Sequence, residues 1–413
     1  MYIHSLPLSH QPFMTPLALY IHWPFCLSIC PYCDFNRYLA TSGNWTVQGA
    51  LQAYLKELDT WLEILGTRSL ISIFIGGGTP SLMDPVLLKE LLKGISERFS
   101  CSLDSIEVTM EANPSSAEGK KLNTFRQAGI NRLSIGVQSF DDQILSFLGR
   151  KHCAQEAIDV IKMAKTIFPE ISFDLIYGHK HHNIDSWKTE LNQALALAGH
   201  HVSLYQLTIE PQTPFFHLHK QGKTLLLTED AMADLYLLTD EILKAQGWQS
   251  YEISNYTYSQ KPCRHNMAYW QYEDYLGLGP GAHSRLCFFA EGQLGRYAIA
   301  NEKHPESWMQ EVNLKGKGIQ EIERIEPEQQ AQEKLLMGLR LEKGLGLHRL
   351  KQDESVIPKY TLSSLFLEKV CHLKESSLIE PLADDLVLSL EGKLRLDTIL
   401  RYLFKDSILE DSK

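Results

Sequence analysis

The stretch LALYIHWPFCLSICPYCDF at residues 17–35 decides how the rest of this chain is interpreted. It starts as an apolar, strand-like run and continues into three cysteines with the spacing Cys26-x-x-x-Cys30-x-x-Cys33, and no fourth cysteine follows closely. Three thiolates at this spacing can hold three irons of a 4Fe-4S cluster. The remaining iron then lacks a protein ligand and is open to a small molecule. A cluster of this kind is the usual apparatus for reductive cleavage of S-adenosylmethionine (SAM).

Two simpler interpretations of these cysteines are a zinc site and unrelated core cysteines. Zinc prefers four ligands, and Asp34, the nearest further candidate, is a poor one, so the sequence favours the cluster. The other five of the eight cysteines are scattered along the chain and do not resemble the disulfide framework of a secreted domain. We therefore expect a reducing compartment and a cytoplasmic protein.

Length and charge bound the remaining possibilities. A chain of 413 residues is too long for one compact core, so two or more domains are expected. The net charge of −10 argues against a nucleic-acid partner, because no basic surface would collect phosphates. No apolar run approaches the roughly 20 residues of a membrane span, although peripheral membrane contact stays open.

The first half of the chain alternates between strand-like and helix-like segments. Short apolar runs without clean alternation are typical of strands that are buried on both faces. Such runs occur at residues 17–23, 72–75, 107–111, 132–137, 172–177 and 202–208. Helical patterns separate them, which requires right-handed parallel crossovers. Six units are too few for a closed eight-stranded barrel, so the sequence predicts an α/β fold with a partial (β/α)6 barrel.

The pattern changes further along the chain. We expect an N-terminal extension at 1–16, the partial barrel at 17–250, and a Gly/Tyr-rich lid and connecting segment at 251–325. We expect residues 326–413 to form a C-terminal helical domain with a winged-helix character. The simplest role for this domain is packing.

Polar residues recur where the predicted strands end, which is where barrels of this kind place their chemistry. Gly76-Gly77-Gly78-Thr79 lets a ligand lie against bare backbone, although such runs are often only tight turns. Glu111, Gln138 and Asp174 interrupt apolar runs and would be costly to bury without partners. Each alone could be a satisfied structural group, but three at matched positions favour a shared polar pocket.

The segment His265-Asn266-Met267-Ala268-Tyr269-Trp270 places an imidazole beside two large aromatic side chains. Imidazole is a standard axial ligand of haem iron, and flat aromatic rings suit a porphyrin face. A histidine beside a tryptophan is more often ordinary packing, so the segment alone is weak evidence.

Together these motifs resemble the radical SAM haem chaperones of the HemW family, which are relatives of the oxygen-independent coproporphyrinogen III oxidase. The likeness runs from about residue 17 to the end of the chain. It implies a partial barrel, a 4Fe-4S cluster and SAM, with Cys26, Cys30 and Cys33 as the cluster ligands. It also implies SAM contacts from Tyr20, Tyr32, Gly77, Gly78, Thr79, Glu111, Gln138, Arg150, Asp174, Thr208 and His283. For haem, it implies contacts from His265, Asn266, Tyr269 and Trp270, with His265 as the first candidate for the iron.

Two differences separate this chain from the oxidase pattern. The oxidase has a fourth cysteine two residues after the third, where this chain has Phe35, and it lacks the His-Asn-x-x-Tyr-Trp signature. The resemblance therefore implies that the protein binds haem and delivers it to an acceptor protein. Radical SAM oxidative decarboxylation of coproporphyrinogen III is the alternative, and a binding scaffold without a cluster is disfavoured by the intact cysteines. Whether the chain is an enzyme and whether it forms a homodimer stay open.

One loop departs from the family pattern. Similar proteins continue from Tyr-Gly after the fifth strand into Leu-Pro-Gly, whereas Gly178 is followed here by His179-Lys180-His181-His182. These histidines could bind iron or form a solvated loop, and we favour the solvated loop.

Overall fold

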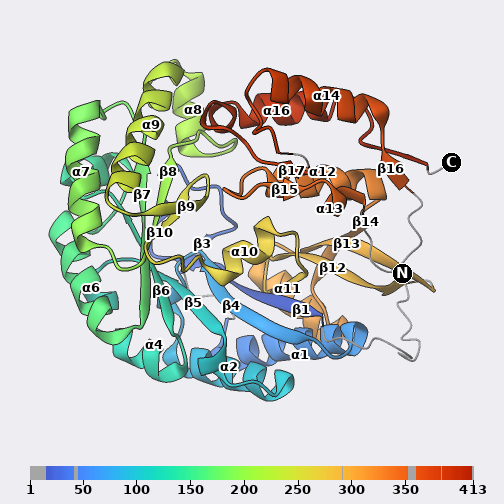
Figure 1. The fold of residues 1–413 in the computed structure, drawn as a ribbon. Coiled ribbons are helices and arrows are strands. Elements are labelled where there is room, and N and C mark those ends of the chain that lie inside the picture. The colour runs from blue at the N-terminus through green and yellow to red at the C-terminus, as the bar shows by residue number, and fades with distance from the viewer. Residues whose placement is uncertain (1–14, 41–44, 291, 352–359, 383, 412–413) are drawn as a thin grey trace.

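The computed structural model describes residues 15–40, 45–290, 292–351, 360–382 and 384–411. Apart from residues 15 and 16, the expected N-terminal extension lies outside these ranges. Six parallel strands form the centre of a large sheet and are neighbours in chain order (Figure 1). These strands are β1 (Pro16–Trp23), β4 (Ser69–Gly77), β5 (Glu107–Ala112), β6 (Arg132–Gln138), β7 (Glu170–Tyr177) and β8 (His201–Gln206). Each coincides with one of the six predicted strands, so the predicted α/β fold is confirmed.

The sheet is open at both ends. Beyond β8 it continues with the antiparallel strands β10 (Asn255–Thr257) and β9 (Gln249–Glu252). Beyond β1 it continues with β11 (Tyr275–Leu278), which is parallel to β1, and then with β12 (His283–Ala290), β13 (Gln293–Asn301) and β14 (Ile319–Arg324). Since β9 and β14 lie at the two edges, the parallel strands form part of a barrel and do not close into a ring.

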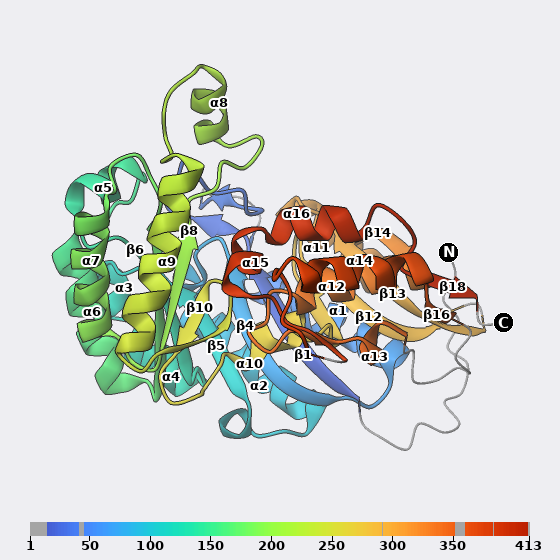
Figure 2. The ribbon, with the colours of Figure 1, turned by 45° about the horizontal axis from the view of Figure 1, so that its top comes forward.

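Helices cover the outer face of the parallel strands (Figure 1). They are α1 (Val47–Leu65), α2 (Pro85–Phe99), α3 (Ser116–Gly119), α4 (Leu122–Ala128), α5 (Asp142–Phe147), α6 (Ala154–Ile167), α7 (Ile184–Leu197) and α9 (Glu229–Ala245), with the 3-10 turns η1 (Pro80–Leu82) and η2 (Leu103–Ser105). Helix α8 (Pro214–Lys220) instead projects from the body of the molecule (Figure 2). Local sequence fixes their starts. Asp84 caps α2 by accepting a hydrogen bond from the Val86 amide, and Pro85 occupies the first helical position.

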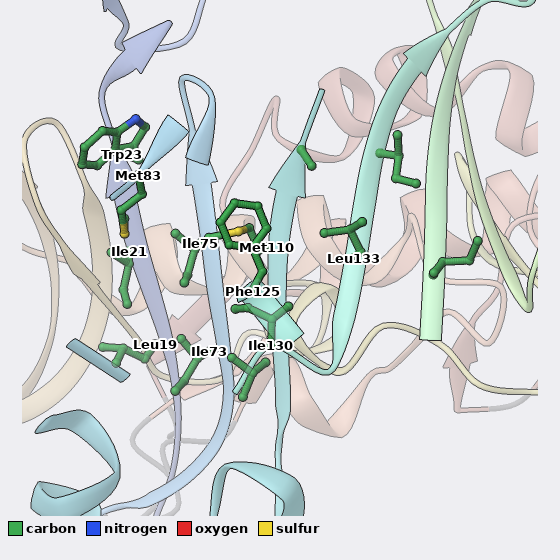
Figure 3. Packing of buried hydrophobic residues seen from close by; sticks show 14 of the residues in the cluster. Leu19, Ile21, Trp23, Ile73, Ile75, Met83, Met110, Phe125, Ile130 and Leu133 are labelled. Atoms are coloured by element: carbon green, nitrogen blue, oxygen red, sulfur yellow. The ribbon is translucent and has the colours of Figure 1, made fainter. Parts of the chain in front are cut away.

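Alternation along each strand divides the side chains between the two faces of the sheet. Leu19 and Ile21 of β1 lie in one layer with Ile73 and Ile75 of β4, and Phe125 from α4 belongs to the same apolar cluster, beside Met110 of β5 (Figure 3). The intervening residues point to the opposite face, which is the interior of the partial barrel.

The segment 251–325, expected as a lid, contains four strands of the large sheet's extension in the structure. β11 to β14 extend the sheet beside β1, and only α10 (Arg264–Trp270) and α11 (Pro305–Lys315) interrupt the strands. These four strands therefore widen the sheet.

The C-terminal part is helical and has its own apolar core. Its elements are α12 (Pro327–Gly338), β15 (Leu345–Gly346), α13 (His348–Lys351), β16 (Tyr360–Leu362), α14 (Ser364–Glu375), β17 (Asp385–Leu386), α15 (Leu390–Leu394), α16 (Leu396–Leu403) and β18 (Leu409–Asp411). Two short antiparallel ladders, β15 with β17 and β16 with β18, join the helices. This part lies against β12 to β14 (Figures 1 and 2), where Arg285 forms an ion pair of 3.1 Å with Glu333 of α12. Of the helices in the described ranges, none has the length and apolar character that crossing a bilayer requires.

A buried carboxylate ties the sheet extension to the barrel. The side chain of Glu57 on α1 is fully buried. It accepts hydrogen bonds from four donors: Gly279 N (2.9 Å), Asn301 Nδ2 (3.0 Å), Trp308 Nε1 (3.1 Å) and Gly318 N (3.1 Å). Burial raises the pKa of Glu57 to about 7, although these donors act to lower it. One side chain thus connects α1 to segments more than two hundred residues away.

Replacing this carboxylate should destabilise the fold. The substitution Glu57→Ala leaves four buried donors without a partner, so we expect a loss of about 3–5 kcal/mol in the free energy of unfolding. Urea denaturation measures the loss, and Glu63→Ala is the matched control because Glu63 is exposed on the same helix. Equal stabilities of the two variants would contradict this role of Glu57.

Candidate functional site

The cysteine loop is attached to the carboxyl ends of β1 and β4. After β1 the chain forms β2 (Phe25–Cys26), which pairs with β3 (Tyr38–Leu39) and so closes the loop on itself. The Gly78 amide donates to the Trp23 carbonyl (2.6 Å), and the Thr79 amide donates to the Phe25 carbonyl (2.9 Å). The glycine run and the cysteine loop are therefore held side by side by backbone hydrogen bonds.

This attachment requires glycine at two positions. Gly77 has a φ of +110°, and a Cβ atom there would lie 2.5 Å from the His22 ring. A Cβ atom on Gly78 would lie 2.7 Å from the Phe25 carbonyl oxygen. Any side chain at either position would push the cysteine loop away from the end of β4.

The far side of the loop is fixed by Asn36. Its Nδ2 donates to the carbonyls of Pro280 (3.0 Å) and Lys303 (2.9 Å), and its own carbonyl accepts a hydrogen bond from His22 Nε2 (2.7 Å). Because that nitrogen donates, His22 Nδ1 must accept the hydrogen bond from the Tyr20 hydroxyl (2.9 Å). Burial lowers the pKa of His22 to about 4, so the ring is neutral at pH 7. Tyr20 thus supports the loop from below.

The three cysteines line one cavity of about 590 Å³. Thr79 Oγ1 lies 3.4 Å from Cys26 Sγ, and Arg150 Nη1 lies 3.5 Å from Cys30 Sγ. A buried cluster needs thiolates, and a nearby guanidinium stabilises their negative charge. No three His, Cys, Asp or Glu side chains in the described ranges converge on a point that could hold a single metal ion. A cluster makes a different demand, because each of its irons takes one thiolate. The donor set therefore fits three corners of a 4Fe-4S cluster.

Most of the predicted SAM contacts line the same cavity. They are Tyr32, Gly77, Gly78, Thr79, Glu111, Gln138, Arg150, Asp174 and Thr208. Tyr20 and His283 are not among its lining residues: Tyr20 supports the loop, and His283 begins β12. Gln138 has a φ of +70°, an uncommon conformation for a residue with a side chain and one that often marks functional sites.

Asn113 also lines this cavity, although it was not among the residues predicted from the sequence. Asn113 Nδ2 donates to Thr79 Oγ1 (3.2 Å), and its Oδ1 accepts from Arg150 Nη2 (2.6 Å). It therefore links the glycine run to the arginine that faces Cys30. Asn113 follows Glu111 by two residues, and a polar residue just past a strand end could have been selected for that reason.

Two half-buried acids, Glu111 and Asp174, line the cavity. Glu111 Oε2 accepts a hydrogen bond from the Gly77 amide (3.2 Å). Burial, followed by the charge of Asp174, raises the pKa of Glu111 to about 8. Burial also raises the pKa of Asp174 to about 6, against a lowering hydrogen bond from Ser203. At pH 7 the pair retains a proton on Glu111, which a cationic ligand would displace.

The predicted haem contacts lie at the other end of the barrel. His265 is only 1% exposed, and its two ring nitrogens pair with Ser72 Oγ and Tyr269 OH, each at 2.9 Å. Ser72 lies five residues before Gly77 on β4, and the His265 ring stacks on the Phe74 ring with the two centroids 5.0 Å apart, on the amino-terminal side of the glycine run. Burial lowers the pKa of His265 to about 3.

The rest of the 265–270 segment is also occupied by protein contacts. Asn266 Nδ2 donates to the Tyr251 hydroxyl (3.1 Å), and the Arg340 guanidinium lies 4.7 Å from the Trp270 ring. Helix α10 closes the base of the barrel, and none of its four predicted haem contacts lines the cysteine cavity. In this arrangement, His265 does not fit an axial haem ligand.

The histidine loop after β7 differs from the prediction of a solvated loop. His181 is exposed, but His179 and His182 are buried, so that interpretation is wrong for these two. His182 Nδ1 accepts from the Gly178 amide and its Nε2 donates to Glu190 Oε2, each at 3.2 Å. The buried carboxylate of Glu190 explains why the loop turns inward.

The raised pKa of Glu111 predicts a pH-dependent stability. Since the folded protein holds this proton up to about pH 8 and the unfolded chain only to about 4.5, the contribution of Glu111 to stability is lost as the pH rises through 8. Glu111→Gln cannot ionise. Without SAM, its Tm relative to wild type should therefore be higher at pH 9 than at pH 5.5, by a few °C. Thermal melts test this, with Glu63→Gln as the exposed control, and parallel pH profiles for wild type and Glu111→Gln would refute it.

Comparison with known proteins agrees with this geometry. The model of the Radical SAM superfamily matches residues 20–194. Radical S-adenosyl methionine domain-containing protein 1, mitochondrial, from Bos taurus is 37% identical over 95% of this chain and 88% of that protein. The heme chaperone HemW of Escherichia coli is 39% identical over 72% of this chain and 76% of that protein.

A solved structure shows the same fold. Coproporphyrinogen III oxidase (HemN) from Escherichia coli superposes with a TM-score of 0.76 at 21% identity, covering 95% of this chain and 91% of that one. At this identity the likeness concerns the fold. The sequence relatives are closer and cover most of the chain. This protein therefore belongs to the radical SAM family that includes HemW and radical SAM domain-containing protein 1.

Proposed function

We propose that this protein binds haem and transfers it to an acceptor protein, and that it carries a SAM-coordinated 4Fe-4S cluster. The observation that supports this most strongly is the likeness, over most of the chain, to relatives named heme chaperone. Phe35 at the position of the fourth cysteine of the oxidase pattern supports the same choice.

The cavity residues suggest how the cluster and SAM would be held. Cys26, Cys30 and Cys33 would each bind one iron, and the fourth iron would bind SAM, for which the cluster supplies an electron when reduced. The bare backbone of Gly77 and Gly78 would lie against the methionine part of SAM, and Glu111 would face positive charge.

The partners and the compartment follow from the same reasoning. Haem and an acceptor protein are the proposed partners, and the cytoplasm is the proposed compartment because it keeps the three cysteines reduced. A homodimer and peripheral membrane contact stay untested predictions.

Titration of haem into the anaerobically reconstituted protein tests the proposal. We expect a complex of one haem per chain with a Soret band that persists through gel filtration, and loss of that band when an apo-globin is added as the acceptor. Absence of a stoichiometric complex would contradict the proposal. Conversion of coproporphyrinogen III to protoporphyrinogen with reductant and SAM would instead support the oxidase.

A further inference from the structure

A haem site needs an apolar surface for the porphyrin face and cations for its two propionates. In the 265–270 segment, the His265 imidazole is buried with both ring nitrogens paired, so neither nitrogen is free for a haem iron. This inference rests on the proposed function and concerns where in the molecule haem lies.

The cysteine loop has an exposed apolar rim. We use this name for Leu27, Ile29, Phe35 and Leu39, whose exposed fractions are 72%, 44%, 55% and 45%. Leu27, Ile29 and Phe35 line the mouth of the cysteine cavity. Four large apolar side chains are thus exposed within thirteen residues of one loop, where their contact with water is unfavourable.

The cluster itself does not require this exposure. Cys26 is only 8% exposed, so the cluster would lie inward of the rim, and the rim side chains would still face outward. SAM would contact the glycine run and the two acids in the cavity. The apolar rim is therefore left for a further ligand.

Two cations line the same mouth. Arg37 and the exposed Lys151 both contribute to the cavity wall. Arg37 Nη1 donates to the Phe35 carbonyl (2.8 Å), which ties the guanidinium to the rim, while its buried Nε has no hydrogen-bond partner. A guanidinium fork and an ammonium group beside an apolar patch complement a flat apolar molecule with two carboxylates.

We infer that haem binds at the mouth of the cysteine cavity, with a porphyrin face against the apolar rim and its propionates toward Arg37 and Lys151. A rim of four side chains is much smaller than the roughly 800 Å² that each partner of a standard protein interface buries. Its size and charge thus favour a tetrapyrrole over a protein partner.

The test compares haem dissociation constants of reconstituted variants, measured from the Soret band. The double substitution Leu27→Ala with Phe35→Ala should weaken binding at least about tenfold, because it removes apolar contact area. The matched control is Leu314→Ala with Phe289→Ala, since those side chains are 79% and 50% exposed away from the cavity, and it should bind like wild type. Iron and sulfide content is measured for each variant to show that the cluster is intact.

Charge-reversal substitutions test the same site if the double variant loses its cluster. Lys151→Glu should weaken haem binding several-fold at low salt, and this loss should be smaller at high salt. Lys162→Glu, whose lysine is exposed on α6, should bind haem like wild type. His265→Gln should bind haem as tightly as wild type.

The outcomes separate the two claims. If wild type forms no haem complex, the proposed function fails. If wild type binds haem but the rim and Lys151 variants bind equally well, this inference fails and the function stands. Loss of binding in a folded His265→Gln variant alone would move the site to the base of the barrel.

Discussion

The absence of side chains at Gly77 and Gly78 is the constraint on which the candidate site depends. Only with bare backbone there can the end of β4 approach His22 and the Phe25 carbonyl closely enough to hold the cysteine loop. The two amide hydrogen bonds that follow fix the height of Cys26 above the sheet. Without this contact the three sulfurs and most of the predicted SAM contacts would not share a cavity.

The partial barrel has two chemically different ends. At the carboxyl ends of the strands, the cysteines, Arg150 and the two acids Glu111 and Asp174 line one cavity. At the amino ends, α10 fills the interior with aromatic rings and paired polar groups. This division places the paired side chains of the 265–270 segment in the packing at one end and the cysteine cavity at the other. Glu57 connects α1 to the sheet extension through the Gly279 amide. The neighbouring Pro280 carbonyl accepts a hydrogen bond from Asn36 of the cysteine loop.

Much of this arrangement could be predicted from the sequence. The six parallel strands were recognisable because strands buried on both faces read as short apolar runs, and the cysteine spacing and glycine run marked the site at their ends. The sheet extension was harder to predict, since charged and polar residues interrupt β13 and β14 and the segment around these strands is rich in Gly and Tyr. The position of His265 could not be predicted, because a local motif does not say at which end of the barrel its helix packs. His179 and His182 were mistaken for solvated residues because the carboxylate that draws the loop inward, Glu190, lies on the following helix.

The central claim is that three cysteine thiolates hold a four-iron cluster whose fourth iron is open to SAM. Mössbauer spectroscopy of protein reconstituted with isotopically enriched iron, with and without SAM, tests it most directly. The account predicts four irons per chain, one of which changes its spectrum when SAM is added. Fewer than four irons, or a cluster in which no iron responds to SAM, would contradict it.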